Sequence, residues 1–313
     1  MSELPLVSVL IPAYNHSEFI TSCLDSIAVE NYPRLELLIL DDGSNDNTYS
    51  VAQRWINEHP MRFEKVWSDR QSNKGICITL NRLITQSTGE FLIFVASDDQ
   101  LVCGGICSRL DALIANSKWL AVIGNASVID KSGQHVAQEA ATALYHADLS
   151  MFQNPESLAI ELILNWSLVG SILMARRLTF FSKSGIGMFD EKLPFEDRDL
   201  YLRLLAIEAL GYVDFTVAKY RVHEKNYSRS RFSIENHIEI LLLSCENNLQ
   251  LFKGLQHKLL ALHIAWLKRC KEQKKVSNYL ARAKSILVLI PIVVLLFIFR
   301  KLYKLKDNRR AAC

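Results

Sequence analysis

Short apolar segments alternate with amphipathic ones between residues 6 and 95, and this alternation constrains the possible folds most. Strands are expected at residues 6–11, 35–40, 63–67 and 91–95. Helices are expected between them, at residues 17–29, 46–58 and 75–86, with Ser17 as the first helix cap. Strands joined by helices in this order run parallel with right-handed crossovers. The sequence therefore predicts an α/β fold with a mostly parallel central sheet, buried on both faces.

After about residue 117 the alternation loosens, which suggests a second half built differently. Strands are expected at residues 120–123 and 126–129, with a hairpin turn at 130–133, and short strands near Ile172 and Val213. Helices are expected at residues 155–164 and 197–209, and one or two long helices at 233–282. We expect a main domain at residues 1–230 with halves at 1–117 and 118–230, a helical extension at 231–284, and a C-terminal segment at 285–313.

The C-terminal segment contains fourteen uncharged residues, Ile286 to Phe299, flanked on both sides by lysines and arginines. As a helix this stretch would be about 21 Å long, whereas a bilayer core needs roughly 20 apolar residues. It also contains Pro291. The basic flanks favour a helix anchored at a membrane surface; a short transmembrane span and a buried soluble helix are the alternatives.

Composition bounds the compartment and the partners. A net charge of +3 is too mild to indicate nucleic acid binding, and seven cysteines without a Cys-x-x-Cys pair fit a reducing compartment. The first residues carry neither a basic region nor a long apolar run, so no secretory signal is expected. We therefore expect the main domain to remain in the cytosol.

Two carboxylates, Asp98 and Asp99, follow the expected strand at residues 91–95. In an open α/β sheet, ligands lie outside the carboxyl ends of the strands. Paired carboxylates there can hold a hard divalent cation, which usually holds a phosphate. The alternative is a surface loop whose aspartates cap the next helix.

Other polar loops follow the same strands. The first is made of Pro12, Ala13, Tyr14 and Asn15, which could cradle a base, with Tyr14 stacking on it. In the second loop Asp42 could accept a hydrogen bond from an imide N–H, and Lys74 precedes a helix that could steady a phosphate. Each of these loops could equally be an ordinary strand-to-helix connection.

The second half offers two further candidates for chemistry. Glu196 and Asp197 stand just before an expected helix, where they could cap it or where one of them could act as a general base. His223 lies in a Tyr-Arg-Val-His segment and could be structural or a ligand.

Together and in this order, the segments resemble the family 2 glycosyltransferases, inverting enzymes of the GT-A fold that use nucleotide-sugar donors. The resemblance covers about residues 6–228 and is carried by segments at residues 7–15, 37–48, 73–75, 89–99, 187–191, 196–204 and 220–223. It implies that residues 12–15 hold the base and ribose, that Asp42 faces a pyrimidine, and that Lys74 lines the pocket. The family motif Asp-x-Asp-Asp reads Ala-Ser-Asp-Asp here, with Ala96 in place of its first aspartate.

For the reaction, the resemblance implies that Asp197 is the general base and Glu196 its neighbour. Asp98 would face the ribose or the metal, Asp99 would face the metal, and His223 would lie near the diphosphate or the metal. The implied cofactor is Mg²⁺ or Mn²⁺, held on the diphosphate of the donor. One displacement by an acceptor hydroxyl would then invert the configuration of the transferred sugar.

UDP or dTDP sugars are the expected donors, and a glycan or a lipid-linked acceptor is the expected partner. A cytosolic domain anchored through residues 285–313 would suit surface-polysaccharide synthesis (O-antigen, capsule or exopolysaccharide) at the bacterial inner membrane. The main alternative is a membrane-attached scaffold that keeps the fold without the chemistry. A nucleotidyltransferase and a dinucleotide-dependent dehydrogenase are disfavoured, because no glycine-rich loop follows the first strand.

Overall fold

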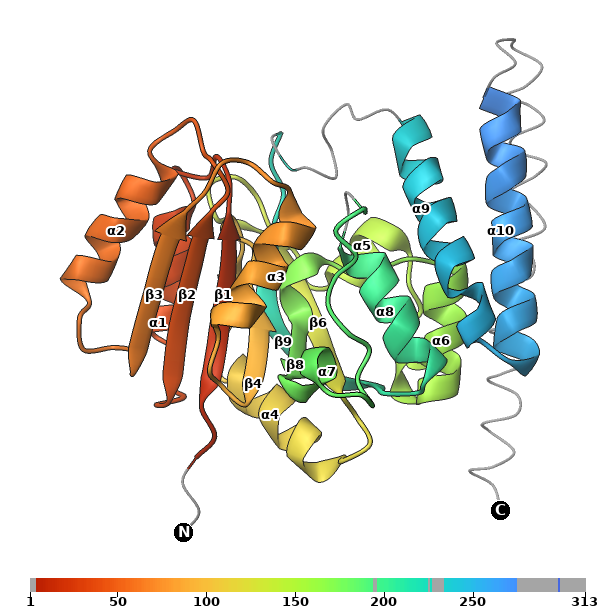
Figure 1. Cartoon of the computed structure of the whole chain (residues 1–313), viewed down its shortest axis with the longest axis horizontal. Helices are drawn as coiled ribbons and strands as arrows, with labels where there is room; N and C mark the ends of the chain where they lie inside the picture. Colours follow the sequence, from red (N-terminus) through yellow and green to blue (C-terminus); the bar gives the residue numbers. More distant parts are fainter. Residues whose placement is uncertain (1–3, 194–195, 225, 227–233, 275–297, 299–313) are drawn as a thin grey trace.

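One mixed sheet runs through the protein and carries strands from both halves of the chain (Figure 1). The computed structural model describes residues 4–193, 196–224, 226, 234–274 and 298. Its strand order is β3-β2-β1-β4-β8-β6-β9-β5, with β7 paired to β6. The strands are β1 (Val7–Ala13), β2 (Leu35–Asp41), β3 (Lys65–Arg70), β4 (Phe91–Phe94), β5 (Gln100–Leu101), β6 (Ala121–Ile129), β7 (His135–Ala137), β8 (Leu173–Arg176) and β9 (Leu210–Arg221).

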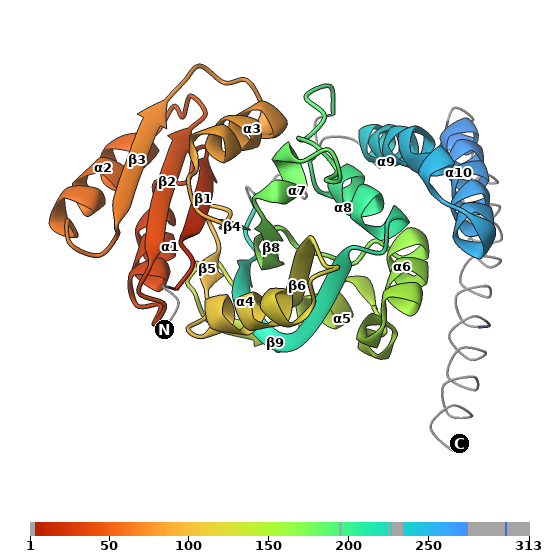
Figure 2. The same ribbon diagram turned by 60° about the horizontal axis from the view of Figure 1, so that its bottom comes forward.

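Helices cover both faces of this sheet. The α-helices are α1 (Ile20–Ala28), α2 (Thr48–Glu58), α3 (Ile76–Gln86), α4 (Gly105–Ala115), α5 (Ala140–Tyr145), α6 (Pro155–Leu164), α7 (Leu178–Phe181), α8 (Asp197–Ala206), α9 (Ile234–Asn248) and α10 (Gly254–Lys274). Short 3₁₀ helices lie at η1 (Leu149–Gln153), η2 (Gly170–Ile172) and η4 (Leu249–Leu251). Figure 2 shows α9 and α10 side by side, at the end of the molecule opposite α2.

The period of two along a strand divides the core between the two faces. In β1, Val9 and Ile11 belong to the core cluster that includes residues of α1, α2 and α4, whereas Leu10 belongs to the cluster that includes residues of α3 and α8. All three side chains are fully buried. The expected sandwich of helices around a buried sheet is therefore confirmed, because both faces of the strand are apolar and each needs a cover.

The parallel part of the sheet is the part that the alternating pattern predicted. β1 pairs in parallel with β2 and with β4, and β2 pairs in parallel with β3. The expected hairpin is confirmed, since β6 and β7 are antiparallel across the turn at residues 130–133. In the second half β8 lies antiparallel between β4 and β6, while β6 and β9 run parallel. The division of the main domain at about residue 117 stays a prediction.

Three local expectations were wrong. The separate strands expected at residues 120–123 and 126–129 form one strand, β6. The first helix begins at Ile20, and the backbone N–H of Ser17 donates to the Asp46 carboxylate at 3.1 Å instead of Ser17 capping that helix. The third strand begins at Lys65, later than expected. It is the edge strand, and its side chains are half-buried or exposed, so its apolar pattern is weak.

The C-terminal region contains two helices within the expected extension, α9 and α10. The apolar segment at 286–299 and its flanks fall outside the described residues, apart from Ile298. In the part of the chain that the structure describes, no helix combines the length and the apolar character needed to cross a membrane.

Gly43 sets the shape of the loop after β2. Its φ of +79° is in the left-handed region, and a Cβ there would lie 2.7 Å from the backbone nitrogen of Asn73. Both facts require glycine, because other residues rarely adopt this φ and this position has no room for a Cβ atom. The close approach brings the loop after β2 against the segment that precedes α3.

We predict that Gly43→Ala lowers the free energy of unfolding by about 1–3 kcal/mol, through strain at positive φ. Urea denaturation would measure this loss. Gly170→Ala is the matched control, because a Cβ at Gly170 meets no atom within 4 Å. Equal stability of the two variants would show that the approach to Asn73 carries no strain.

Candidate active site

The site lies at the edge of the sheet where the parallel strands β1, β2 and β4 end. Parallel strands share one carboxyl edge, so the loops that follow them meet there. The loops after β1 and β2 are bonded directly to each other. The backbone N–H of Asn15, a residue with φ of +55°, donates to Ser44 Oγ at 2.9 Å, and Asn15 Oδ1 accepts from the N–H of Asn45 at 2.8 Å.

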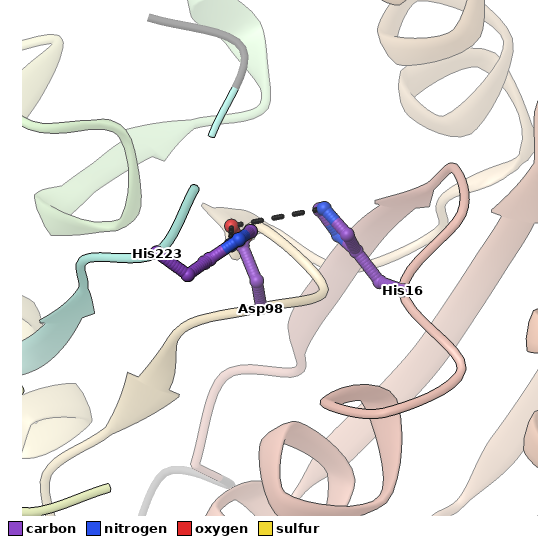
Figure 3. A group of neighbouring side chains, drawn as sticks. All are labelled: His16, Asp98 and His223. Carbon is purple, nitrogen blue, oxygen red and sulfur yellow. Dashed lines mark hydrogen bonds and ion pairs between the residues drawn. The ribbon is translucent and has the colours of Figure 1, made fainter. Parts of the chain in front are cut away.

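A cluster of His16, Asp98 and His223 is the centre of the site (Figure 3). His223 Nε2 lies 2.9 Å from Asp98 Oδ2, and His16 Nε2 lies 3.8 Å from the same oxygen. One donor atom from each residue lies within 4.8 Å of the other two. The three come from the loop after β1, the loop after β4 and the segment after β9, which are far apart in the sequence.

Neighbouring polar groups hold the cluster in place. His16 Nδ1 lies 2.8 Å from Ser97 Oγ, and Asn226 donates from Nδ2 to Asp98 Oδ2 at 3.4 Å. The buried Arg221 guanidinium donates from Nε to the carbonyl oxygen of Asp98 at 2.7 Å. The end of β9 is therefore tied to the loop after β4 through both side-chain and backbone groups.

Asp99 points into a different set of contacts. It is buried, its Oδ2 accepts from Ser171 Oγ at 2.6 Å, and its Oδ1 accepts from the backbone N–H of Arg221 at 2.8 Å. Both of its oxygens therefore bond to protein groups in this structure. The assignment of Asp99 as a metal ligand stays a prediction, whereas Asp98 and His223 do come together as expected.

The two adjacent aspartates differ in acidity. Burial opposes the charge of Asp98, but the hydrogen bond from His223 and the imidazoles of His16 and His223 outweigh it, so the pKa of Asp98 is lowered. Burial and the Asp98 charge raise the pKa of Asp99 well above its ordinary value. Because the surroundings shift the two pKa values in opposite directions, the negative charge resides on Asp98, beside the histidines.

Asp42 anchors the loop before α3. Its Oδ1 accepts from the backbone N–H of Lys74 and its Oδ2 from that of Gly75, both at 2.9 Å. Gln71 Nε2 also donates to Oδ1 at 2.9 Å. The structure thus brings Asp42 and Lys74 together as expected, through the Lys74 backbone. The contact of Asp42 with a pyrimidine stays a prediction.

The first loop leaves Tyr14 open to solvent. Tyr14 is 43% exposed, whereas Ala13 is buried and its carbonyl oxygen accepts from the N–H of Asp42 at 2.8 Å. Pro12 is half-buried within β1. An exposed ring next to this loop is available to stack on a flat group. The roles of residues 12–15 toward a base and ribose stay predictions.

Glu196 and Asp197 stand at the start of α8 and are half-buried. Burial and the Asp197 charge raise the pKa of Glu196 to about 8, and burial raises the pKa of Asp197. Glu196 is the N-cap residue of α8, but its side chain makes no cap hydrogen bond. Asp197 Oδ1 accepts from the N–H of Arg198 at 2.6 Å. Two adjacent carboxyls whose pKa values are both raised titrate as a pair and hold a shared proton more readily than two isolated ones.

Arg198 fixes the start of α8 to the surrounding helices. Its buried guanidinium donates to the Ile163 carbonyl oxygen at 3.3 Å and to Cys245 Sγ at 3.5 Å, and it lies 5.3 Å from the ring centre of Trp166. These contacts join α8 to α6 and α9. The C-terminal helical extension therefore helps to position Asp197.

Sequence reasoning missed several residues of the site. They are His16, Ser97, Ser171, Arg221 and Asn226. His16 directly follows Pro-Ala-Tyr-Asn, so its place in that loop was a usable signal. The other four are bonded across 70 or more positions to a partner that no local pattern identifies.

The donor set fits a divalent cation. Donors on one octahedral ion at about 2.1 Å lie about 3 Å apart when adjacent and about 4.2 Å apart when opposite. The 2.9 Å and 3.8 Å separations from Asp98 fall within this range. Two imidazoles with one carboxylate suit Mn²⁺ and other transition ions, and the open sides of such a site leave room for phosphate oxygens.

The raised pKa of Glu196 predicts a pH-dependent stability. Its pKa rises from 4.5 to about 8 on folding, so the free energy of unfolding should fall as the pH rises through this interval. Glu196→Gln should remove much of that dependence. Urea denaturation at about pH 5 and about pH 8 would measure it. Glu191→Gln, in an exposed position of the same loop, is the control and should keep the wild-type dependence; a wild-type slope in Glu196→Gln would contradict the prediction.

Solved structures share this fold. TarS residues 1–349 from S. aureus, in complex with UDP-GlcNAc, matches with a TM-score of 0.64 at 18% identity, over 92% of this chain and 80% of that chain. The mannosyltransferase PcManGT from Pyrobaculum calidifontis, in complex with GDP-Man and Mn²⁺, matches with a TM-score of 0.64 at 17% identity, over 99% and 83%. At these identities the likeness shows the fold, which is α/β of the GT-A type.

Sequence comparisons point to one family. Residues 8–159 match the family described as glycosyl transferase family 2. An uncharacterized glycosyltransferase of Rickettsia typhi is 27% identical over 70% of this chain, which spans 65% of that relative's length. A PGL/p-HBAD biosynthesis glycosyltransferase of Mycobacterium bovis is 32% identical over 35% of this chain and 42% of its own length. These matches show a glycosyltransferase family 2 domain at residues 8–159.

Proposed function

We propose that this protein transfers a sugar from a nucleoside-diphosphate sugar to an acceptor hydroxyl, with inversion at the anomeric carbon. The observation that carries the proposal is the cluster of His16, Asp98 and His223 at the carboxyl edge of the parallel strands. Its donor atoms support a cation site on the donor side of the sheet, where Ala96 replaces the first aspartate of the family motif. The solved structures with UDP-GlcNAc and with GDP-Man and Mn²⁺ support a nucleotide-sugar donor.

Asp197 is the proposed general base. It lies at the start of a helix that Arg198 anchors to α6 and α9, so its position is well defined. A partly desolvated carboxylate with a raised pKa is a stronger base than one in water. Glu196, holding the proton of the pair, would keep a second negative charge away from the acceptor hydroxyl.

We propose the metal ligands that the sequence predicted, which are Asp98, Asp99 and His223. A divalent cation held there, Mn²⁺ or Mg²⁺, would supply positive charge to the departing diphosphate. Pro12, Ala13, Tyr14, Asn15, Asp42 and Lys74 are proposed to hold the base and ribose. The bonds of Asn15 to Ser44 and Asn45, and those of Asp42 to Lys74 and Gly75, support a preformed nucleotide pocket.

UDP or dTDP is the proposed nucleotide, and a glycan or lipid-linked molecule at the bacterial inner membrane is the proposed acceptor, in surface-polysaccharide synthesis. The uncharged stretch at 286–299 with basic flanks supports attachment to the membrane from the cytoplasmic side. On α10, Leu255 and Leu262 are exposed and seven residues apart, on one face of the helix, with Lys258 exposed between them. Such a face suits the boundary between water and lipid headgroups.

A panel of nucleotide sugars incubated with the protein and a membrane lipid extract would test this function. Release of nucleoside diphosphate that depends on the lipid extract, with incorporation of the sugar into lipid, is the expected result. A scaffold would release no diphosphate from any donor, with or without metal.

We predict that Asp197→Asn lowers kcat by about 10²–10⁴-fold, because a general base contributes that much, while donor affinity stays close to wild type. Diphosphate release and equilibrium nucleotide binding would give the two quantities. Asp111→Asn, an exposed carboxylate on α4, is the control. Turnover within a few-fold of wild type in Asp197→Asn would remove Asp197 from the role of base.

Metal removal should abolish donor cleavage. After dialysis against a chelator, diphosphate release is expected to fall to background, because the leaving diphosphate lacks a counter-charge. Added Mn²⁺ or Mg²⁺ should restore the release. Unchanged release from the chelated protein would contradict the proposed role of the cation.

A further inference from the structure

His16 occupies a position that the family resemblance did not assign. It belongs to the loop after β1, and its backbone N–H donates to Thr48 Oγ1 at 2.8 Å, which fixes the loop beside the start of α2. Figure 3 shows its ring extending toward Asp98 from the side opposite His223. The side chain of His16 is 19% exposed, so it stands at the open side of the cluster, while His223 and Asp98 are buried beneath it.

The orientation of the ring leaves one nitrogen directed at the cluster. Nδ1 faces Ser97 Oγ at 2.8 Å, and Nε2 faces Asp98 Oδ2 at 3.8 Å. When Nδ1–H donates to Ser97, Nε2 carries the lone pair, which is the tautomer that binds a metal. A hydrogen bond at the other ring nitrogen is the usual way in which proteins orient a metal-binding histidine.

We propose that His16 is a third protein ligand, so that the chain holds its cation through two imidazoles and one carboxylate before any nucleotide arrives. A hydrogen bond requires contact at about 2.9 Å. The longer 3.8 Å separation between His16 Nε2 and Asp98 Oδ2 is instead suited to two ligands that share one ion. This inference deepens the proposed function, because it concerns the metal site of the same reaction.

The ligand set determines which cation is preferred. Mg²⁺ loses its water reluctantly and is usually bound by one or two carboxylates together with phosphate oxygens. Imidazole nitrogen favours transition ions, and affinity for such sites rises from Mn²⁺ toward Cu²⁺. A site with two imidazoles therefore binds Mn²⁺ without nucleotide and prefers it to Mg²⁺, whereas a site with one imidazole depends more on the diphosphate for its ligands.

The experiment uses the full chain, freed of metal and without nucleotide, and Mn²⁺ alone as the probe. Titration followed by the electron paramagnetic resonance of free Mn²⁺ should give one bound ion per chain. His16→Gln should weaken Mn²⁺ binding by at least about 10-fold. Losing a group that only orients a ligand already costs about that much metal affinity. His135→Gln, an exposed histidine on β7, is the matched control and should bind like wild type.

Pulsed electron paramagnetic resonance of the bound ion gives a second readout that a structural role would not change. Wild type should show two imidazole nitrogens coupled to Mn²⁺, and His16→Gln should show one. Circular dichroism of the metal-free variant checks that it is folded. Mn²⁺ should also raise the melting temperature of wild type more than that of His16→Gln, because binding to the folded state stabilises it.

The result that overturns the inference is Mn²⁺ binding by His16→Gln with wild-type affinity, or a single imidazole nitrogen in wild type. Failure of the proposed function looks different. In that case wild type would bind Mn²⁺ through two imidazoles and yet release no diphosphate from any nucleotide sugar. If His16→Gln cleaves a donor like wild type and binds Mn²⁺ equally well, the glycosyltransferase function stands and His16 is not a ligand.

Discussion

The contact between Asp98 and His223 is the interaction on which the site depends. It joins the loop after β4 to the segment after β9, which are far apart in the sequence. A buried carboxylate without a partner is costly, because charge removed from water loses its hydration. Asp98 avoids that cost through His223, Asn226 and the nearby His16. The same groups that keep it charged form the His16, Asp98 and His223 cluster, whose donor atoms suit a cation.

Arg221 shows how the fold holds this arrangement rigid. Its guanidinium is buried, and it donates to main-chain oxygens of Asp98, Asp130 and Lys131, while its own N–H donates to Asp99. Hydrogen bonds to charged groups are each worth about 1.5–3 kcal/mol. Arg221 of β9 thus holds the loop that carries the two acidic residues, together with His223 at Asp98 and Ser171 at Asp99.

Chemistry and support are divided between the two ends of the chain. The first half supplies the loops after β1 and β2 and two of the three cluster residues, whereas the second half supplies His223 and the pair at the start of α8. The C-terminal helices contribute through packing, since Cys245 of α9 contacts Arg198, and Asn248 Nδ2 donates to Asp199 at 2.7 Å. The helical extension therefore helps to hold the start of α8, where Asp197 lies.

The family resemblance implied the place of His223, and the sequence by itself determined the parallel β–α part of the fold and the positions of Asp98 and Asp42 at the edge of the sheet. These follow from local patterns, because the period of apolar residues and the polar residue after each strand are both visible in a short window. Only the tertiary structure decided that β8 lies antiparallel beside β4, that Asp99 turns away from the histidines, and that His16 joins them. The physical reason is that these outcomes depend on contacts such as those of Arg221 and Ser171, which link residues separated by 70 or more positions and leave no periodic trace in the chain.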